Sequence, residues 1–190
     1  MKTLLLPMLL GAALSHAIAA PATYKIDPSH TFPSFEAEHI GISVWRRKFN
    51  ASSGTVTLDR VAKTGSIEVD IDTASVDFGH DALNTLAVGK DLFDAAKYRP
   101  AHYKGTLAGF TNGAPTQAVG TLTLHGVTRP VNLQLILFKC ILHPLLKREL
   151  CGADAVTTIQ RDEFGITAGK DYGFKMDVAL RIQVEAVAVG

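Results

Sequence analysis

Several short segments of this chain alternate apolar and polar residues, and this period of two constrains the fold more than any other feature. In the stretch 66–72, Ile67, Val69 and Ile71 share one face of an extended strand while acidic residues take the other. One face of such a strand is expected to be buried and the other exposed to solvent. Further strand signals fall at 24–26, 33–39, 42–49, 55–58, 101–107, 119–124, 131–138, 157–159 and 178–184.

These segments predict eight or nine strands in one all-β domain, and one antiparallel barrel is their simplest closure. Full charges such as Glu68 and Arg181 lie on the polar faces. A membrane barrel would turn its apolar face outward, so the apolar face is predicted to point inward. The spacing of Leu83, Leu86 and Ala87 by three and four predicts one short helix over 81–88, which ends before Gly89.

The N-terminus has the three parts of a secretory signal peptide. Lys2 precedes an apolar run over 4–14, and small residues follow at Ala17 and Ala19. We therefore expect a cleaved signal peptide at 1–19, a single mature domain at 20–190 and export of that domain. The run is short for a bilayer span, so no integral membrane segment is expected in the mature protein.

Charge gives no reason to expect nucleic acid or an anionic membrane surface as a partner. Nineteen basic residues oppose eighteen acidic ones, for a formal net charge of +1.

Cys140 and Cys151 are the two cysteines of the chain. In an exported protein this pair indicates a disulfide that closes one excursion of the chain, and two unpaired buried thiols are the alternative. The segment 142–155, which contains Pro144, is expected to be a loop or short helix over an opening.

Two further local predictions concern strand 131–138 and the segment before it. Val131, Leu133, Leu135 and Leu137 are expected to share the inward face. The segment 125–130 is expected to be a hairpin connection in which Gly126 takes a positive φ and Pro130 occupies a position that needs no ladder donor.

A set of motifs, taken in order, resembles one family. They are Asp27-Pro28-Ser29-His30, Phe35, His39-Ile40-Gly41, the segment 69–76, Asp91-Leu92-Phe93-Asp94, Tyr98-Arg99-Pro100, the segment 122–131 around His125-Gly126-Val127-Thr128-Arg129-Pro130, and the segment 161–166. Together they resemble the YceI-like family of periplasmic polyisoprenoid-binding proteins over nearly all of the mature chain.

The resemblance implies an extended, eight-stranded, lipocalin-like barrel that holds a long isoprenoid chain or similar amphiphile, such as an isoprenoid quinone or its precursor, often as a homodimer. It implies no established enzymatic activity and no cofactor other than the bound lipid. The chain departs from the family at 82–89, where Arg and His are usual and the sequence is mostly apolar. The cysteine-bounded insert resembles the form found in a bacterial subset.

Binding a linear hydrocarbon needs a continuous apolar lining more than any special group. Inward-facing residues of the predicted strands are therefore candidates to line a ligand cavity, and plain core packing is the alternative for each. The candidates are Phe35, His39, Ile67, Val69, Ile71, Tyr103, Leu122, Leu124, Val131, Leu133, Leu180 and Ile182.

The histidines and basic residues are weighed as polar contacts for a ligand against structural roles. His39 could bond a ligand head group, although a core role is the alternative. Asp27 is expected to cap its own turn beside His30, and His125 to fix its hairpin. A basic mouth at 45–48, beginning with Trp45, competes with a solvated charge run. The histidines show no metal-ligand spacing, and no nucleophile motif is present.

Three hypotheses follow. The first is a periplasmic carrier or store of a polyisoprenoid lipid, with no catalytic step. The second is an enzyme that acts on a small amphiphile with His39 as acid or base. The third is a stress-related partner-binding protein, which would need an exposed apolar patch, whereas the outer strand faces are charged.

Overall fold

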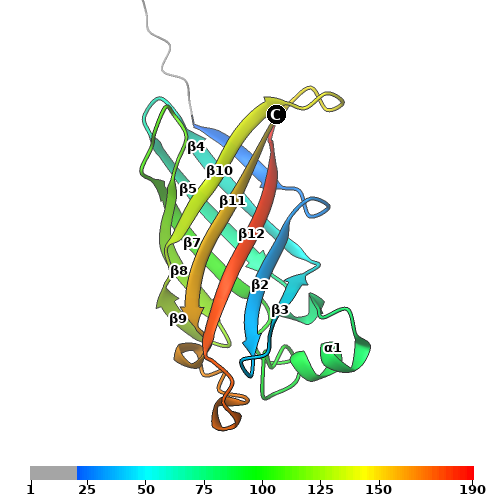
Figure 1. The fold of residues 1–190 in the computed structure, drawn as a ribbon. Coiled ribbons are helices and arrows are strands. Elements are labelled where there is room, and N and C mark those ends of the chain that lie inside the picture. The colour runs from blue at the N-terminus through cyan, green and yellow to red at the C-terminus, as the bar shows by residue number, and fades with distance from the viewer. Residues whose placement is uncertain (1–20) are drawn as a thin grey trace, which may run out of the picture.

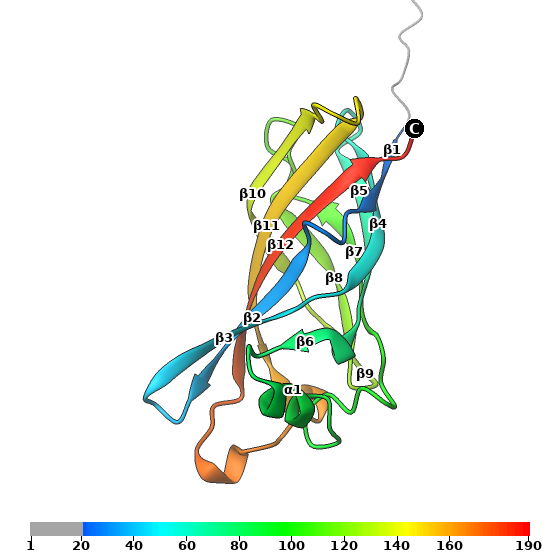
Figure 2. The same ribbon diagram turned by 90° about the vertical axis from the view of Figure 1, so that its right-hand side faces the viewer.

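A computed structural model describes residues 21–190, and the signal peptide predicted at 1–19 lies outside the described residues. Its twelve strands form one curled sheet (Figures 1 and 2). The elements are β1 Ala22–Ile26, β2 Phe32–His39, β3 Ser43–Phe49, β4 Ser52–Asp59, β5 Thr64–Ile71, η1 Thr73–Ser75, β6 Val76–Asp77, α1 Asp81–Ala87, β7 Ala101–Ala108, β8 Gln117–Leu124, β9 Val127–Pro130, β10 Leu133–Leu142, β11 Glu149–Gln160, η2 Arg161–Phe164, η3 Lys170–Tyr172 and β12 Asp177–Ala188.

Eight of the strands close into a barrel. Their order is β1-β4-β5-β7-β8-β10-β11-β12, and β12 pairs back with β1, with Tyr24 opposite Ala188. The first half of β12 pairs instead with β2, and β2, β3 and β6 extend the wall toward α1. Every paired strand is antiparallel, so the predicted all-β antiparallel barrel is confirmed.

A five-residue turn between β1 and β2 lets both strands pair with β12. The Asp27 carboxylate accepts a hydrogen bond from the backbone N–H of Ser29 and contacts the ring of His30, both at 2.9 Å. The Thr31 hydroxyl bonds both the backbone N–H and the carbonyl of Glu185 on β12. His30 holds the pKa of Asp27 below its ordinary value. The predicted capping role of Asp27 is therefore confirmed.

The period of two places the core inside the barrel. Val69 is buried on β5, whereas Glu68 and Asp70 beside it face solvent. On β7 the buried positions likewise alternate, with Tyr103 inside and Lys104 outside, where Lys104 approaches Glu68. The two faces of one strand thus carry opposite chemistry, as the sequence predicts.

The turn between β8 and β9 consists of His125 and Gly126, with φ values of 52° and 76°. A Cβ atom at Gly126 would lie 2.5 Å from the ring of Tyr98, so glycine is required for space as well as for conformation. Pro130 ends β9, which pairs with β8 alone, and its missing donor costs no ladder bond. Both predictions for this turn are confirmed.

The predicted helix is confirmed as α1, which lies at one end of the barrel beside β6 (Figure 2). Among residues 21–190, no helix has the length and apolar character needed to cross a membrane.

The expectation of a loop or short helix over 142–155 is wrong. β10 and β11 continue through this region, and only the turn 143–148 separates them. Cys140 and Cys151 occupy directly opposite positions in the ladder and form the predicted disulfide. Proline and cysteine indicate an irregular segment in sequence, but here Pro144 falls within a tight turn and the disulfide joins two regular strands.

The expectation that Leu137 faces inward is also wrong. The register between β10 and β11 shifts between Leu135 and Leu137, which marks a β-bulge. A bulge inserts one residue and reverses the faces that follow it. Leu133 on the near side is 7% exposed, Leu137 on the far side is 56% exposed, and Phe138 packs against the core instead.

The disulfide is expected to stabilise the barrel by about 3 kcal/mol, because it closes a short loop in the unfolded chain. A Cys140→Ser/Cys151→Ser variant should therefore unfold at lower urea concentration than the oxidised protein. Equal midpoints for the two proteins would contradict this.

Candidate functional site: an apolar cavity along the barrel axis

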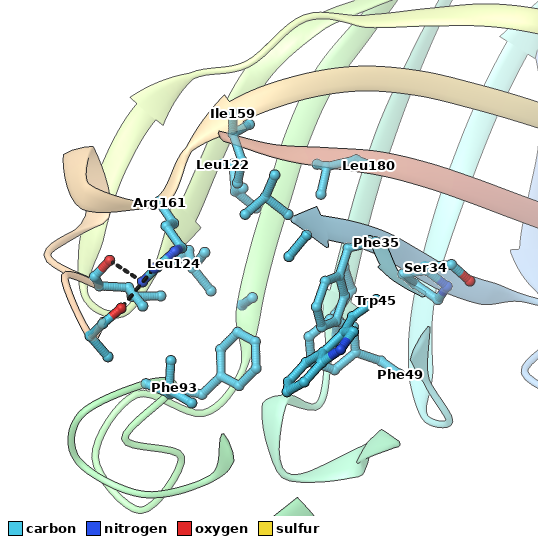
Figure 3. Close-up of a pocket in the computed structure, with 18 of the residues that line it drawn as sticks. Ser34, Phe35, Trp45, Phe49, Phe93, Leu122, Leu124, Ile159, Arg161 and Leu180 are labelled. Carbon is cyan, nitrogen blue, oxygen red and sulfur yellow. Dashed lines mark hydrogen bonds between the residues drawn. The ribbon is translucent and has the colours of Figure 1, made fainter. Parts of the chain in front are cut away.

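The main cavity lies at the α1 end of the barrel and has a volume of about 380 Å³ (Figure 3). Its walls come from β2, β3, β5, β7, β8, β10, β11 and β12, together with the segments that cover this end. Leu122, Ile159 and Leu180 form the aliphatic side of the wall, and Phe35, Phe49 and Trp45 face them. The cavity is therefore a hollow part of the barrel interior with an almost wholly apolar surface.

A second cavity of about 100 Å³ adjoins the first toward the other end of the barrel. It lies among Val56, Leu58, Leu107 and Phe138. Five residues line both cavities, so the two lie next to each other inside the barrel, and we call the first the wide lobe and the second the narrow lobe. These shared residues are Pro33, Ile71, Tyr103, Leu133 and Ile182.

Tyr103 stands at the junction of the two lobes. Its hydroxyl is shared between the backbone carbonyls of Ala118 and Val131, each at 3.1 Å. Burial raises the pKa of Tyr103 to about 12. Because the hydroxyl is already bonded to the backbone, the side chain offers its apolar ring to the cavity.

Aromatic rings surround the wide lobe. Phe35 on β2 contacts Phe49, Phe78 and Phe93, with ring centroids 5.6 to 6.3 Å apart, and Phe49 contacts Phe93 at 5.3 Å. Edge and tilted contacts of this kind are favourable and hold rings in fixed orientations. The wall is therefore firm on this side, and it presents flat surfaces suited to a hydrocarbon chain.

His39 and Trp45 lie on neighbouring strands at the mouth of the wide lobe. The imidazole stacks on the indole with centroids 4.3 Å apart, and Phe174 meets it edge-on at 5.2 Å. The Arg47 guanidinium lies over the rings of Trp45 and Phe78 at 5.4 and 5.2 Å. The mouth thus combines aromatic surface with one imidazole and one positive charge.

The run of basic residues after Trp45 contributes only in part to this mouth. Arg46 bonds Glu36 at 2.9 Å, and the Lys48 ammonium lies over the ring of Phe32. Arg47 is the member that packs on the aromatic rings of the mouth. Of the basic residues predicted to form a mouth, only Arg47 packs on its aromatic rings.

Glu38 adds an unpaired acceptor. Both of its carboxylate oxygens are buried without a hydrogen-bond partner among the described residues, and Glu38 lines the wide lobe. The Nε atom of Arg47 is likewise buried and unpaired. A buried polar atom without a partner is costly, so the Glu38 oxygens favour a bound group that can donate hydrogen bonds.

Arg161 closes the far side of the wide lobe. Its guanidinium donates to the carbonyls of Ile166 at 3.0 Å and Ala168 at 2.7 Å (Figure 3). Burial lowers the pKa of this guanidinium. These bonds hold the segment 165–168 across the end of the barrel, which makes Arg161 a structural part of the wall.

Helix α1 contributes Leu83 and Leu86 to the same lobe. These residues fall in the segment where the resemblance would place Arg and His. The helix therefore extends the apolar lining toward solvent.

All twelve sequence candidates line the two lobes. The structure places Phe35, His39, Leu122, Leu124, Val131 and Leu180 on the wide lobe, Ile67 and Val69 on the narrow lobe, and Ile71, Tyr103, Leu133 and Ile182 on both. His125 lines neither lobe. It donates to the carbonyl of Phe164 at 3.2 Å and packs on Tyr98, as expected of a residue that fixes its turn.

Sequence reasoning missed several aromatic and charged residues of the wide lobe. Phe49, Phe78, Phe93, Glu38 and Arg161 were not among the candidates. The alternation of Trp45, Arg47 and Phe49 on one strand was the available signal for that strand. Phe78 and Phe93 lie outside regular strands, so no periodicity could have indicated them.

Comparisons with known proteins agree with this architecture. A YceI-like domain profile matches residues 24–186. A UPF0312 protein of Pseudomonas fluorescens (strain SBW25) is 32% identical over 174 residues, which covers 87% of this chain and 88% of that protein. Burkholderia cenocepacia BcnA superposes with a TM-score of 0.70 at 22% identity, over 84% of this chain and 98% of the other. A polyisoprenoid-binding domain from Saccharophagus degradans superposes with a TM-score of 0.64 at 18% identity, over 88% and 99%.

The bonds of Tyr103 predict a specific pH dependence of stability. Tyr103→Phe should lower the free energy of unfolding by roughly 1 to 2 kcal/mol at pH 8, because two buried carbonyls lose their donor. The pKa of Tyr103 is about 12 in the folded protein against 10.0 as its ordinary value. The tyrosine's contribution is therefore complete below pH 10 and is lost as the pH rises to 12, by at most about 3 kcal/mol.

Urea unfolding of both proteins from pH 8 to 12 measures this, and the gap between them should shrink above pH 10. The unchanged protein has four tyrosines, and its tyrosinate absorbance should show one that ionises later than the others. This late step should be missing from the Tyr103→Phe variant. A gap that stays constant across this range would contradict the assignment.

Proposed function

The chain belongs to the YceI-like family, and from this membership and its hollow apolar interior we propose that it binds and carries a long-chain lipid such as a polyisoprenoid. The observation that supports this proposal most strongly is the two-lobed apolar cavity inside the barrel. Each methylene removed from water contributes about 0.8 kcal/mol, so an elongated apolar space favours a linear hydrocarbon over a compact polar molecule. The polyisoprenoid-binding domain among the structural neighbours supports the same ligand class.

The proposed head group lies at the mouth beside His39, Glu38 and Arg47. His39 and Glu38 line the cavity and offer a ring nitrogen and unpaired carboxylate oxygens, and Arg47 adds a positive charge behind the ring of Trp45. A hydroxyl, an amide or a quinone carbonyl would find partners here, and the hydrocarbon would extend toward Tyr103 and Leu133. An isoprenoid quinone or its precursor belongs to this class.

Export to the periplasm is part of the proposal. The pattern of residues 1–19 is that of a secretory signal, and a disulfide persists in an oxidising compartment. No catalytic step is proposed. His39, the acid or base of the enzyme hypothesis, packs between Trp45 and Phe174, and no carboxylate among residues 21–190 hydrogen-bonds its ring.

Extraction of protein purified under native conditions, followed by mass spectrometry, tests the function directly. We expect a co-purifying prenyl lipid, and the apoprotein should take up an added prenyl alcohol and return it with unchanged mass. A barrel that is repeatedly empty and takes up no prenyl lipid would sink the carrier proposal. A returned lipid of altered mass would favour the enzyme that uses His39.

Two leucines of β10 give a matched pair of variants. Leu133→Glu puts a carboxylate into the wall shared by both lobes, and it should weaken prenyl alcohol binding at least ~100-fold because the charge must be desolvated against hydrocarbon. Leu137→Glu makes the same change on the outer face beyond the bulge, and binding should be unchanged.

Quenching of the single tryptophan, Trp45, at the mouth reports binding. Circular dichroism shows whether each variant is folded, and if Leu133→Glu unfolds, the uncharged Leu133→Gln replaces it. Equal affinities for folded Leu133 and Leu137 variants would place the ligand outside the barrel.

A further inference from the structure

The hairpin turn between β10 and β11 exposes a cluster of large aliphatic residues. We call residues 139–148 the β10–β11 tip. Leu145 is 84% exposed and Leu142 68% exposed, with Ile141 and Leu146 about half exposed beside them. The turn extends past the last paired residues of β12, at the end of the barrel opposite α1 (Figure 1). Monomeric proteins rarely leave such a cluster in water, so this surface marks a site of contact.

The backbone donors of the turn are satisfied without water. The N–H groups of Leu145 and Leu146 both donate to Nδ1 of His143 at 3.1 Å. The His143 N–H donates to the carbonyl of Arg148 at 2.8 Å, and the Lys147 N–H donates to the carbonyl of His143 at 3.0 Å. Pro144 has no N–H. Unpaired backbone donors are costly next to lipid, and this turn satisfies each of its N–H groups from 143 to 147.

The charge of the tip differs from that of the whole chain. Lys139, Lys147 and Arg148 lie within it, and residues 139–148 contain no Asp or Glu. This segment therefore carries a charge of +3 in a chain whose total is only +1. The net charge of the whole chain is close to zero and gave no reason to expect an anionic partner surface. The tip is nevertheless a local basic segment next to exposed leucines.

We propose that the β10–β11 tip docks on an anionic lipid bilayer. Leu142, Leu145 and Leu146 enter the boundary between head groups and acyl chains, and Lys147 and Arg148 contact lipid phosphates. A pair of tips from two copies is the competing occupant. A tip of this size is much smaller than the 20 to 30 residues that each partner of a standard protein interface uses, and like charges would oppose each other. This docking does not depend on what fills the cavity.

Flotation with vesicles tests the docking, using residues 21–190 so that the apolar run near the N-terminus does not bind the vesicles itself. The protein should float with phosphatidylcholine vesicles that contain phosphatidylglycerol, and far less with phosphatidylcholine alone or at high salt. Leu142→Ser/Leu145→Ser/Leu146→Ser should lower partitioning at least about ten-fold. Lys147→Ala/Arg148→Ala should lower it by about thirty-fold at low salt.

Ile42→Ser is the matched control, because Ile42 is 75% exposed on the β2–β3 turn at the other end of the barrel. Its partitioning should equal that of the unchanged protein. Equal flotation of the triple serine variant, or no flotation of the unchanged protein, would overturn the proposal. So would a size-exclusion shift from dimer to monomer caused by the serine changes, since the leucines would then join two copies.

Binding of prenyl alcohol to the same variants, followed by Trp45 fluorescence, separates docking from ligand binding. Unchanged ligand affinity in a variant that no longer floats supports a separate docking surface. Ligand affinity that falls together with flotation would show a disturbed barrel and count against the tip as an independent site.

Discussion

The pairing of one edge of the long strand β12 with two successive partners determines the rest of this structure. β12 hydrogen-bonds to β2 in its first half and to β1 in its last residues, and the turn 27–31 allows the change of partner. Closure through β1 leaves the eight-stranded barrel without a free edge between β1 and the last residues of β12, and it turns the inward side chains toward a common axis. In an open sheet, the same apolar face would need a second layer of protein to bury it. In the closed barrel, the apolar faces of the strands are buried against one another.

Closure leaves space because the side chains of the wall pack against one another around the axis. Phe35, Phe49 and Phe93 contact each other around the wide lobe, and Tyr103 is held at the junction by two backbone carbonyls. Rings fixed in this way cannot collapse into the centre without losing those contacts. The cavity is thus maintained by the hydrogen bond and ring geometry of its own walls, which is consistent with a site formed before any ligand enters.

Sequence periodicity located most of the wall, because inward and outward positions follow directly from a period of two in unbroken strands. It placed Ile67, Val69 and Ile71 correctly, and it failed at Leu137, where a bulge reverses the faces. It also treated Pro144 and the cysteines as signs of irregular chain, although only six residues separate the two strands there. The mouth depends on contacts between distant segments, such as Phe93 against Phe49, and no local pattern records such contacts.

The two ends of the barrel have different chemistry, and the difference has energetic meaning. At the α1 end, charged and aromatic groups turn toward the cavity, and the unpaired oxygens of Glu38 carry a desolvation cost that a bound head group would offset. At the other end, Leu142 and Leu145 turn away from the core and contribute no burial to the fold, while His143 satisfies the backbone of their turn. Selection for stability alone explains neither feature. Each agrees with the contact proposed for it outside the folded chain, one with the polar end of a lipid and one with a lipid surface.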